Sequence, residues 1–97
     1  MMAGLGLLLA GAASSAQEPS APELSGRLGC FACHSLQGRG GKLAIPLDGA
    51  GDRFTPVQLE TLLTRPRQIH PGAKMPSYAY LPREERQALV DFLQGLK

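Results

Sequence analysis

The stretch Gly29–Lys42, with the sequence GCFACHSLQGRGGK, contains the two cysteines of the chain, three positions apart, and a histidine directly after the second. Residues three apart lie on the same face of a helical turn, so Cys30 and Cys33 can reach the same side of a bound group. Phe31 and Ala32 between them carry no reactive group. The sequence therefore predicts a compact site at which two thiols and the His34 imidazole act together.

Three kinds of site use such residues. A thioredoxin-like redox pair needs a strand-helix-strand setting, and the glycine-rich flanks of Cys30 show no alternating strand pattern. A structural zinc site needs four ligands, and the strong donors are only Cys30, Cys33, His34 and His70, of which Cys33 and His34 are adjacent. C-x-x-C-H as a site of covalent haem attachment explains every residue, because both sulfurs form thioethers and His34 lies under the iron. We therefore predict haem c as the cofactor.

Length and composition fit a single small domain. The chain has 97 residues, of which 43% are hydrophobic, 19% charged and only 5% aromatic, with no tryptophan. A chain of this size commonly depends on a disulfide, a metal or a cofactor for stability, because its own core is small. A bound cofactor would supply part of that core.

The N-terminal segment predicts export. An apolar run from Met1 to Ala13 is followed by small residues, and Ser14 and Ala16 suit cleavage after Ala16, although no basic residue precedes the run. A membrane anchor is the second interpretation, but the run is shorter than the roughly 20 apolar residues that span a bilayer. We expect a signal peptide over 1–16, a flexible leader over 17–22, a folded domain over 23–97 and a location in the bacterial periplasm.

The rest of the chain reads as helices joined by loops. A weak helix leads into the cysteine motif, and 37–54 is glycine-rich and without a helical period. Thr55 begins a helix as its N-cap, Pro56 occupies the first helical position, and the helix ends at Arg65 because the next residue is proline. The last helix begins near Leu81–Pro82. No segment reads as a strand, and the apolar stripes of the two later helices are Leu59, Leu62 and Leu63, then Leu89, Phe92, Leu93 and Leu96.

The Cys30–His34 motif, the glycine-rich loop, Lys74-Met75-Pro76 and the closing helix together resemble a small monohaem class I c-type cytochrome over Leu24–Lys97. The resemblance implies an all-α, compact cytochrome c-like domain of three to four short helices wrapped around one covalently attached haem, with the terminal helices crossing. It also implies that His34 is the proximal and Met75 the distal iron ligand. Such proteins transfer single electrons and are not enzymes.

One loop departs from the family pattern. A Gly-Pro pair there commonly supplies the carbonyl that accepts the second N–H of the proximal histidine, whereas this chain has Ala44-Ile45-Pro46-Leu47. The carbonyl of Ile45 or Pro46 can serve instead, because the acceptor is a backbone atom. The sequence leaves the choice between them open.

Met75 has two rival interpretations. His70, five positions earlier, could bind the iron in its place, and Met75 could be an ordinary core methionine. Pro76 favours Met75 as the ligand, because a residue before proline is biased towards extended backbone. Arg53 could reach a haem propionate or be a solvated loop arginine, and Tyr78 and Tyr80 are expected to pack against the ring.

Charge indicates the kind of partner. Residues 36–80 carry six basic residues (Arg39, Lys42, Arg53, Arg65, Arg67, Lys74) against three acidic ones (Asp48, Asp52, Glu60). A basic rim near the haem suits redox proteins with acidic docking surfaces. No motif for nucleic-acid binding is found.

Two function classes fit these features. The first is an electron carrier, soluble or acting as the small haem subunit of a respiratory or dehydrogenase complex, which could be membrane-bound. The second is a gas sensor or peroxidase-like enzyme with a displaceable distal ligand. Met75 decides between them, because two protein ligands leave no open coordination position on the iron.

Overall fold

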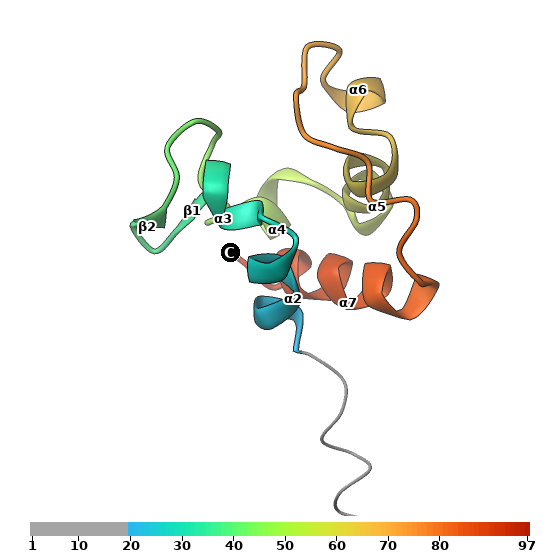
Figure 1. Cartoon of the computed structure of the whole chain (residues 1–97), viewed down its shortest axis with the longest axis horizontal. Helices are drawn as coiled ribbons and strands as arrows, with labels where there is room; N and C mark the ends of the chain where they lie inside the picture. The colour runs from blue at the N-terminus through green and yellow to red at the C-terminus, as the bar shows by residue number, and fades with distance from the viewer. Residues whose placement is uncertain (1–19) are drawn as a thin grey trace, which may run out of the picture.

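The computed structural model describes residues 20–97. The predicted signal peptide, residues 1–16, and residues 17–19 of the predicted leader lie outside the described residues. Residues 20–97 form six helices and one short hairpin, and this part of the chain is mostly helical, as predicted (Figure 1). In chain order the elements are α2 (Ala21–Arg27), α3 (Cys30–Cys33), β1 (Ser35–Leu36), β2 (Arg39–Gly40), α4 (Ala50–Arg53), α5 (Pro56–Thr64), α6 (Pro66–Ile69) and α7 (Arg83–Gln94).

Helix α2 begins at a complete N-terminal cap, although the sequence predicts only a weak helix here. The Ser20 side chain accepts a hydrogen bond from the Glu23 backbone N–H, and the Glu23 carboxylate accepts one from the Ser20 backbone, which together form a capping box. Gly29 then adopts a left-handed conformation with φ 85°, which glycine tolerates without strain, and turns the chain from α2 into α3.

Helix α5 begins and ends where the sequence predicts. Thr55 is the N-cap, its side chain accepts from the Gln58 backbone N–H, and the helix ends at Thr64 with Arg65 as C-cap. The four-residue helix α6 was not predicted: Pro66 ends α5, but the same residue suits the first position of a new helical turn.

Helix α7 crosses α2 and packs against α5, so the N- and C-terminal helices cross as expected (Figure 1). Glu84 and Glu85 lie in its first turn, where carboxylates stabilise the positive end of the helix dipole. Its most buried side chains are Leu89 and Val90. The predicted stripe omitted Val90, because α7 is contacted from two sides and its buried face is wider than one stripe of residues.

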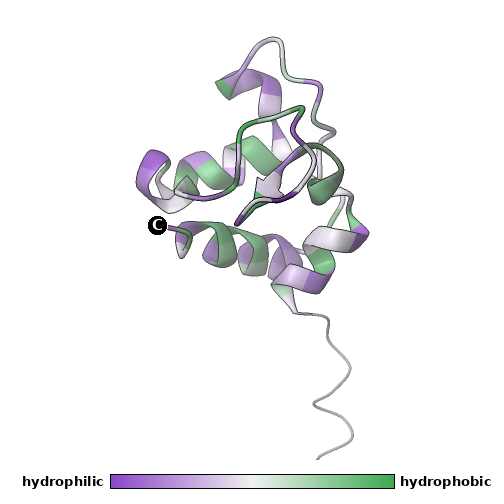
Figure 2. Cartoon of the chain, turned by 90° about the vertical axis from the view of Figure 1, so that its left-hand side faces the viewer, coloured by the Kyte–Doolittle hydropathy of each residue, from purple (hydrophilic) through white to green (hydrophobic). Residues whose placement is uncertain are grey.

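The hydrophobic core lies between α2, α5, α7 and the segment that precedes α7. Hydrophobic residues gather on the inner faces of these helices and hydrophilic ones on their outer faces (Figure 2). The buried members are Leu24, Leu59, Leu63, Tyr78, Leu81, Leu89 and Val90, and Leu28, Phe54, Leu62, Met75 and Leu93 pack against them.

The glycine-rich region holds more structure than predicted. The expectation of no strand was wrong for two pairs of residues: β1 and β2 form a small antiparallel hairpin in which Ser35 pairs with Gly40. Gln37 and Gly38 form its turn with φ 54° and 82°, as two-residue hairpin turns require. Strands this short leave too little alternation to detect in the sequence.

Helix α4, also within this region, packs against the end of α7. The Gly51 backbone N–H donates to the Leu96 carbonyl at 2.7 Å, and the Gln94 side chain donates to the Gly51 carbonyl at 3.0 Å. A Cβ at Gly51 would collide with the Gln94 carbonyl, so only glycine fits this contact. Within residues 20–97, no helix is both long and apolar enough to cross a membrane.

Candidate functional site

The two cysteines and His34 lie together on one turn of chain. Cys30 begins α3 and is half-buried, Cys33 ends the helix and is exposed, and both thiols are free. His34 is the C-cap residue: its backbone is extended (φ −105°, ψ 147°), and its N–H donates to the Cys30 carbonyl. The structure therefore places the three predicted residues side by side, as their spacing indicates.

The His34 ring is held by the backbone of a neighbouring loop. Its Nδ1 lies 2.7 Å from the Ile45 carbonyl oxygen. A carbonyl can only accept, so Nδ1 carries a proton, and in the neutral ring Nε2 then has its lone pair available for a metal. The carbonyl that the sequence left open is thus that of Ile45. A bond of this kind orients a ligating imidazole and raises its basicity.

Residues 41–48, here called the proximal loop, run along α3 and are fixed by backbone hydrogen bonds. Gly41 N–H donates to the Phe31 carbonyl at 2.9 Å, Ala44 N–H to the Cys33 carbonyl at 2.9 Å, and Leu47 N–H to the Ser35 carbonyl at 2.8 Å. The approach is so close at Gly41 that a Cβ there would collide with the Ala32 carbonyl. The loop thereby holds the Ile45 carbonyl against His34.

The Arg53 side chain binds the backbone of the proximal loop. Its guanidinium donates to the Asp48 carbonyl at 2.7 Å and to the Pro46 carbonyl at 2.9 Å. The Asp48 carboxylate in turn accepts from the Gln37 backbone N–H at 3.0 Å, at the hairpin turn. The sequence offered two interpretations of Arg53, contact with a haem propionate and a solvated loop arginine. In the structure the side chain is exposed but binds two backbone carbonyls of the proximal loop, and contact with a propionate stays a prediction.

Met75 lies in residues 71–80, here called the distal segment, between α6 and α7. It is partly buried and packs against the core, while the flanking Lys74 and Pro76 are exposed. In Figure 1 the distal segment and the proximal loop lie on opposite sides of α3. Met75 thus belongs to a segment that is distant in sequence from the cysteine motif.

Tyr78 connects the distal segment to the cysteine motif. Its side chain is 5% exposed, and its hydroxyl donates to the Leu28 carbonyl at 3.0 Å. Burial is the main cause that raises the pKa of Tyr78 above its ordinary value of 10.0, and negative charge on Cys30, Tyr80 and Cys33 raises the pKa further. Tyr80, by contrast, is 72% exposed. This hydrogen bond has no signature in the sequence, because its acceptor is a backbone atom fifty positions away.

The rival ligand His70 makes its ring contact with Phe54. It is exposed, and its ring packs edge-on against Phe54 with the ring centroids 6.5 Å apart. In residues 20–97, no three His, Cys, Asp or Glu side chains group in a way that could hold a metal ion.

Burial raises the pKa of the Cys30 thiol above its ordinary value of 9.0.

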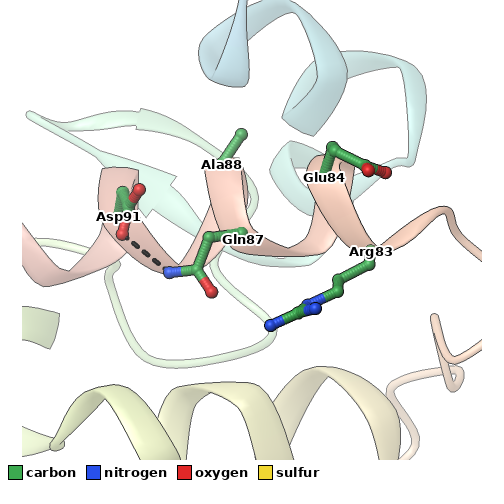
Figure 3. Close-up of a pocket in the computed structure, with 5 residues that line it drawn as sticks. All are labelled: Arg83, Glu84, Gln87, Ala88 and Asp91. Atoms are coloured by element: carbon green, nitrogen blue, oxygen red, sulfur yellow. Dashed lines mark hydrogen bonds between the residues drawn. The ribbon is translucent and has the colours of Figure 1, made fainter.

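Two hollows on the surface of residues 20–97 are lined by residues other than Cys30, Cys33, His34 and Met75. One of about 470 Å³ lies along α7 and is lined by Arg83, Glu84, Gln87, Ala88 and Asp91; Figure 3 shows these side chains, with Gln87 donating to Asp91 at 2.9 Å. Because a single helix contributes all five, this is an open helix surface and no enclosed binding site. A second hollow, of about 270 Å³, borders the hairpin and includes Phe31 from α3.

The comparisons identify the family. The cytochrome c family model matches residues 20–97. The chain therefore belongs to the cytochrome c family, whose members bind covalently attached haem c and generally serve as electron carriers. The resemblance noted from the sequence and the all-α cytochrome c fold are thus confirmed.

A solved structure is also similar. A chain of the crystal structure of SoxXA from P. pantotrophus has 26% identity to this chain with a TM-score of 0.66, covering 84% of this chain and 85% of that one. No match was found among curated proteins.

The residues present fit haem c. Two free thiols lie on one helical turn, and the adjacent imidazole has Nδ1 bound to a carbonyl and Nε2 available. Haem c needs these groups: two sulfurs for thioethers and one imidazole nitrogen for the iron.

Proposed function

We propose that this protein is an electron-transfer cytochrome in which Cys30 and Cys33 hold the haem and His34 and Met75 bind its iron. The observation that carries the proposal is the hydrogen bond from His34 Nδ1 to the Ile45 carbonyl, 2.7 Å long. It fixes the tautomer and the ring orientation that an axial ligand needs.

Each residue has a distinct task. Cys30 and Cys33 provide the sulfurs for the two thioether bonds, and the proximal loop keeps the His34 ring from rotating. Met75 would supply its thioether sulfur as the second protein ligand of the iron and would leave no coordination position for water. Haem c, when bound, supplies an iron that alternates between the ferrous and ferric states. Methionine ligation favours the ferrous state, which suits an acceptor of electrons at the high-potential end of a chain.

The partners that suit this protein are redox proteins with acidic docking surfaces. Three basic residues near the site are exposed: Arg39 lies in the hairpin, Lys42 in the proximal loop and Lys74 beside Met75. Positive charge on these sides of the site accelerates encounter with an acidic surface. The similarity to a chain of SoxXA supports work as the small haem subunit of a redox complex in addition to work as a free carrier.

Export to the bacterial periplasm belongs to the same proposal. It rests on the apolar run from Met1 to Ala13 and on the small residues at Ser14 and Ala16. N-terminal sequencing of the protein from its native host should find Gln17 or a close neighbour first. Recovery of Met1 in the membrane fraction would favour an anchored form.

Spectroscopy of two variants tests the iron ligands. We expect the protein, matured with its haem, to be low-spin and to show the weak near-infrared band of sulfur-to-iron charge transfer when oxidised. Met75→Ala should abolish this band, because it removes the sulfur. His70→Ala is the matched control and should retain the band, because His70 packs against Phe54.

The opposite result has a clear meaning. A high-spin protein without the near-infrared band that binds carbon monoxide rapidly would have an open coordination position. That outcome would contradict the carrier and favour a gas sensor or a peroxidase-like enzyme.

A further inference from the structure

The distal segment is attached to the rest of the protein mainly through Ser77 and Tyr78, the two residues that follow Pro76. The Tyr78 backbone N–H donates to the Leu63 carbonyl at 2.7 Å, and its hydroxyl donates to the Leu28 carbonyl at 3.0 Å. Leu63 is in α5, and Leu28 directly follows α2, two residues before Cys30. Tyr78 therefore joins the distal segment both to a core helix and to the start of the cysteine motif.

Ser77 strengthens the same attachment point. Its hydroxyl donates to the Thr64 carbonyl at 2.6 Å and accepts from the Ala79 backbone N–H at 3.2 Å. On the other side of Met75, Lys74, Gly72 and Pro71 are exposed.

The only hydrogen bond to Met75 itself, among the described residues, is weak. The Arg67 guanidinium lies 3.4 Å from the Met75 carbonyl, near the upper limit for such a bond. Burial of the Met75 side chain against the core therefore depends on the attachment at Ser77 and Tyr78, two and three residues further along.

We propose that Tyr78 is a positioning residue that keeps Met75 on the iron, and that residues 75–78 leave their place as one unit. The inference rests on the proposed role of Met75 and adds the residue that controls access to the sixth coordination position. If an external ligand displaces Met75, the unit moves and the bond between the Tyr78 hydroxyl and the Leu28 carbonyl breaks. The strength of that distant hydrogen bond then contributes to the retention of Met75.

Tyr78→Phe is the direct test, because it removes the hydroxyl and keeps the buried ring. In the variant, displacement of Met75 no longer breaks the bond to Leu28. The oxidised haem-containing protein should therefore bind imidazole about tenfold more tightly than the wild type, which corresponds to about 1.4 kcal/mol for one hydrogen bond to a partly buried carbonyl.

Two further variants serve as a control and as a second test of the attachment at Ser77 and Tyr78. Tyr80→Phe removes the same hydroxyl from a ring that is 72% exposed, and its imidazole affinity should stay within about twofold of the wild type. Ser77→Ala removes the bond to Thr64 and should shift the affinity in the same direction as Tyr78→Phe. It serves as a second variant if Tyr78→Phe matures poorly.

A purely structural role of Tyr78 gives a different pattern. We expect heating of Tyr78→Phe to abolish the near-infrared sulfur band well before the helices unfold, with a wider gap between the two temperatures than in the wild type. If the gap and the imidazole affinity equal those of the wild type while overall stability falls, Tyr78 only supports the fold and the inference is wrong. If the wild type itself lacks the band, the proposed function fails, independently of the Tyr78 result.

Discussion

The proximal loop and the distal segment both position an iron ligand, but they are fixed by different kinds of bond. The proximal loop lies against α3 and β1 mainly through bonds between backbone groups, at Gly41, Ala44 and Leu47, and the Arg53 side chain adds two bonds to its carbonyls. The distal segment has one such bond to the core, from the Tyr78 backbone N–H to the Leu63 carbonyl, and otherwise depends on side chains, the hydroxyls of Ser77 and Tyr78.

This difference predicts different sensitivity to substitution. Backbone bonds survive most changes of side chain and fail only where a side chain cannot fit at all. Bonds made by side chains fail one substitution at a time. The proximal ligand should therefore be the rigid one, and the distal ligand the one that evolution can adjust or release.

Gly41→Ala should break the proximal loop and gives the largest effect expected. The added Cβ meets the Ala32 carbonyl and, close behind it, the Cys33 backbone, neither of which can move without disturbing the cysteine motif. We expect a loss of at least about 3 kcal/mol of unfolding free energy, as for severe overpacking, and a low yield of haem-containing protein. Thermal unfolding followed by circular dichroism measures it.

Gly72→Ala is the control in the distal segment. A Cβ at Gly72 meets nothing within 4 Å, so the stability should change by no more than about 0.5 kcal/mol. If Gly41→Ala and Gly72→Ala lose similar amounts of unfolding free energy, the proximal loop does not depend on a closer backbone contact than the distal segment does.

Arg53→Ala sharpens the comparison with a smaller effect. It removes two hydrogen bonds to the Pro46 and Asp48 carbonyls, but the side chain is exposed, so water replaces part of what is lost. We expect a loss of about 1 kcal/mol of unfolding free energy. The imidazole affinity should remain near that of the wild type, since the distal segment keeps its own bonds.

Arg39→Ala is its control, because Arg39 is an exposed arginine of the hairpin whose side chain makes no hydrogen bond within residues 20–97. It should leave stability unchanged. An Arg53→Ala variant as stable as Arg39→Ala would show that the loop needs no support beyond its backbone bonds.

The parts of the fold that the sequence predicted are those with local causes. The capping residues Thr55 and Gln58 define the start of α5 through bonds within one turn, and Pro66 defines its end. The Cys30–His34 motif is likewise local, because all its members lie on adjacent positions of one turn.

The parts that could not be predicted depend on contacts between distant residues or on very short elements. Nothing in the neighbourhood of Tyr78 indicates that its hydroxyl meets the Leu28 carbonyl, and nothing near Arg53 indicates the Pro46 carbonyl. The choice of Ile45 over Pro46 as the acceptor for His34 depends on how the whole loop lies against α3. Such backbone acceptors have no signature in the amino-acid sequence.

The distance in sequence between bonded partners has a consequence for the order of folding. The His34 ring meets its acceptor eleven positions away, whereas the Tyr78 hydroxyl meets Leu28 across fifty. Contacts between near neighbours form first, because the entropy of closing a long loop must be overcome before its contacts contribute. The proximal half can therefore assemble while the chain that carries Met75 is still unstructured, so that an early folding species would have His34 in place and the other axial position accessible.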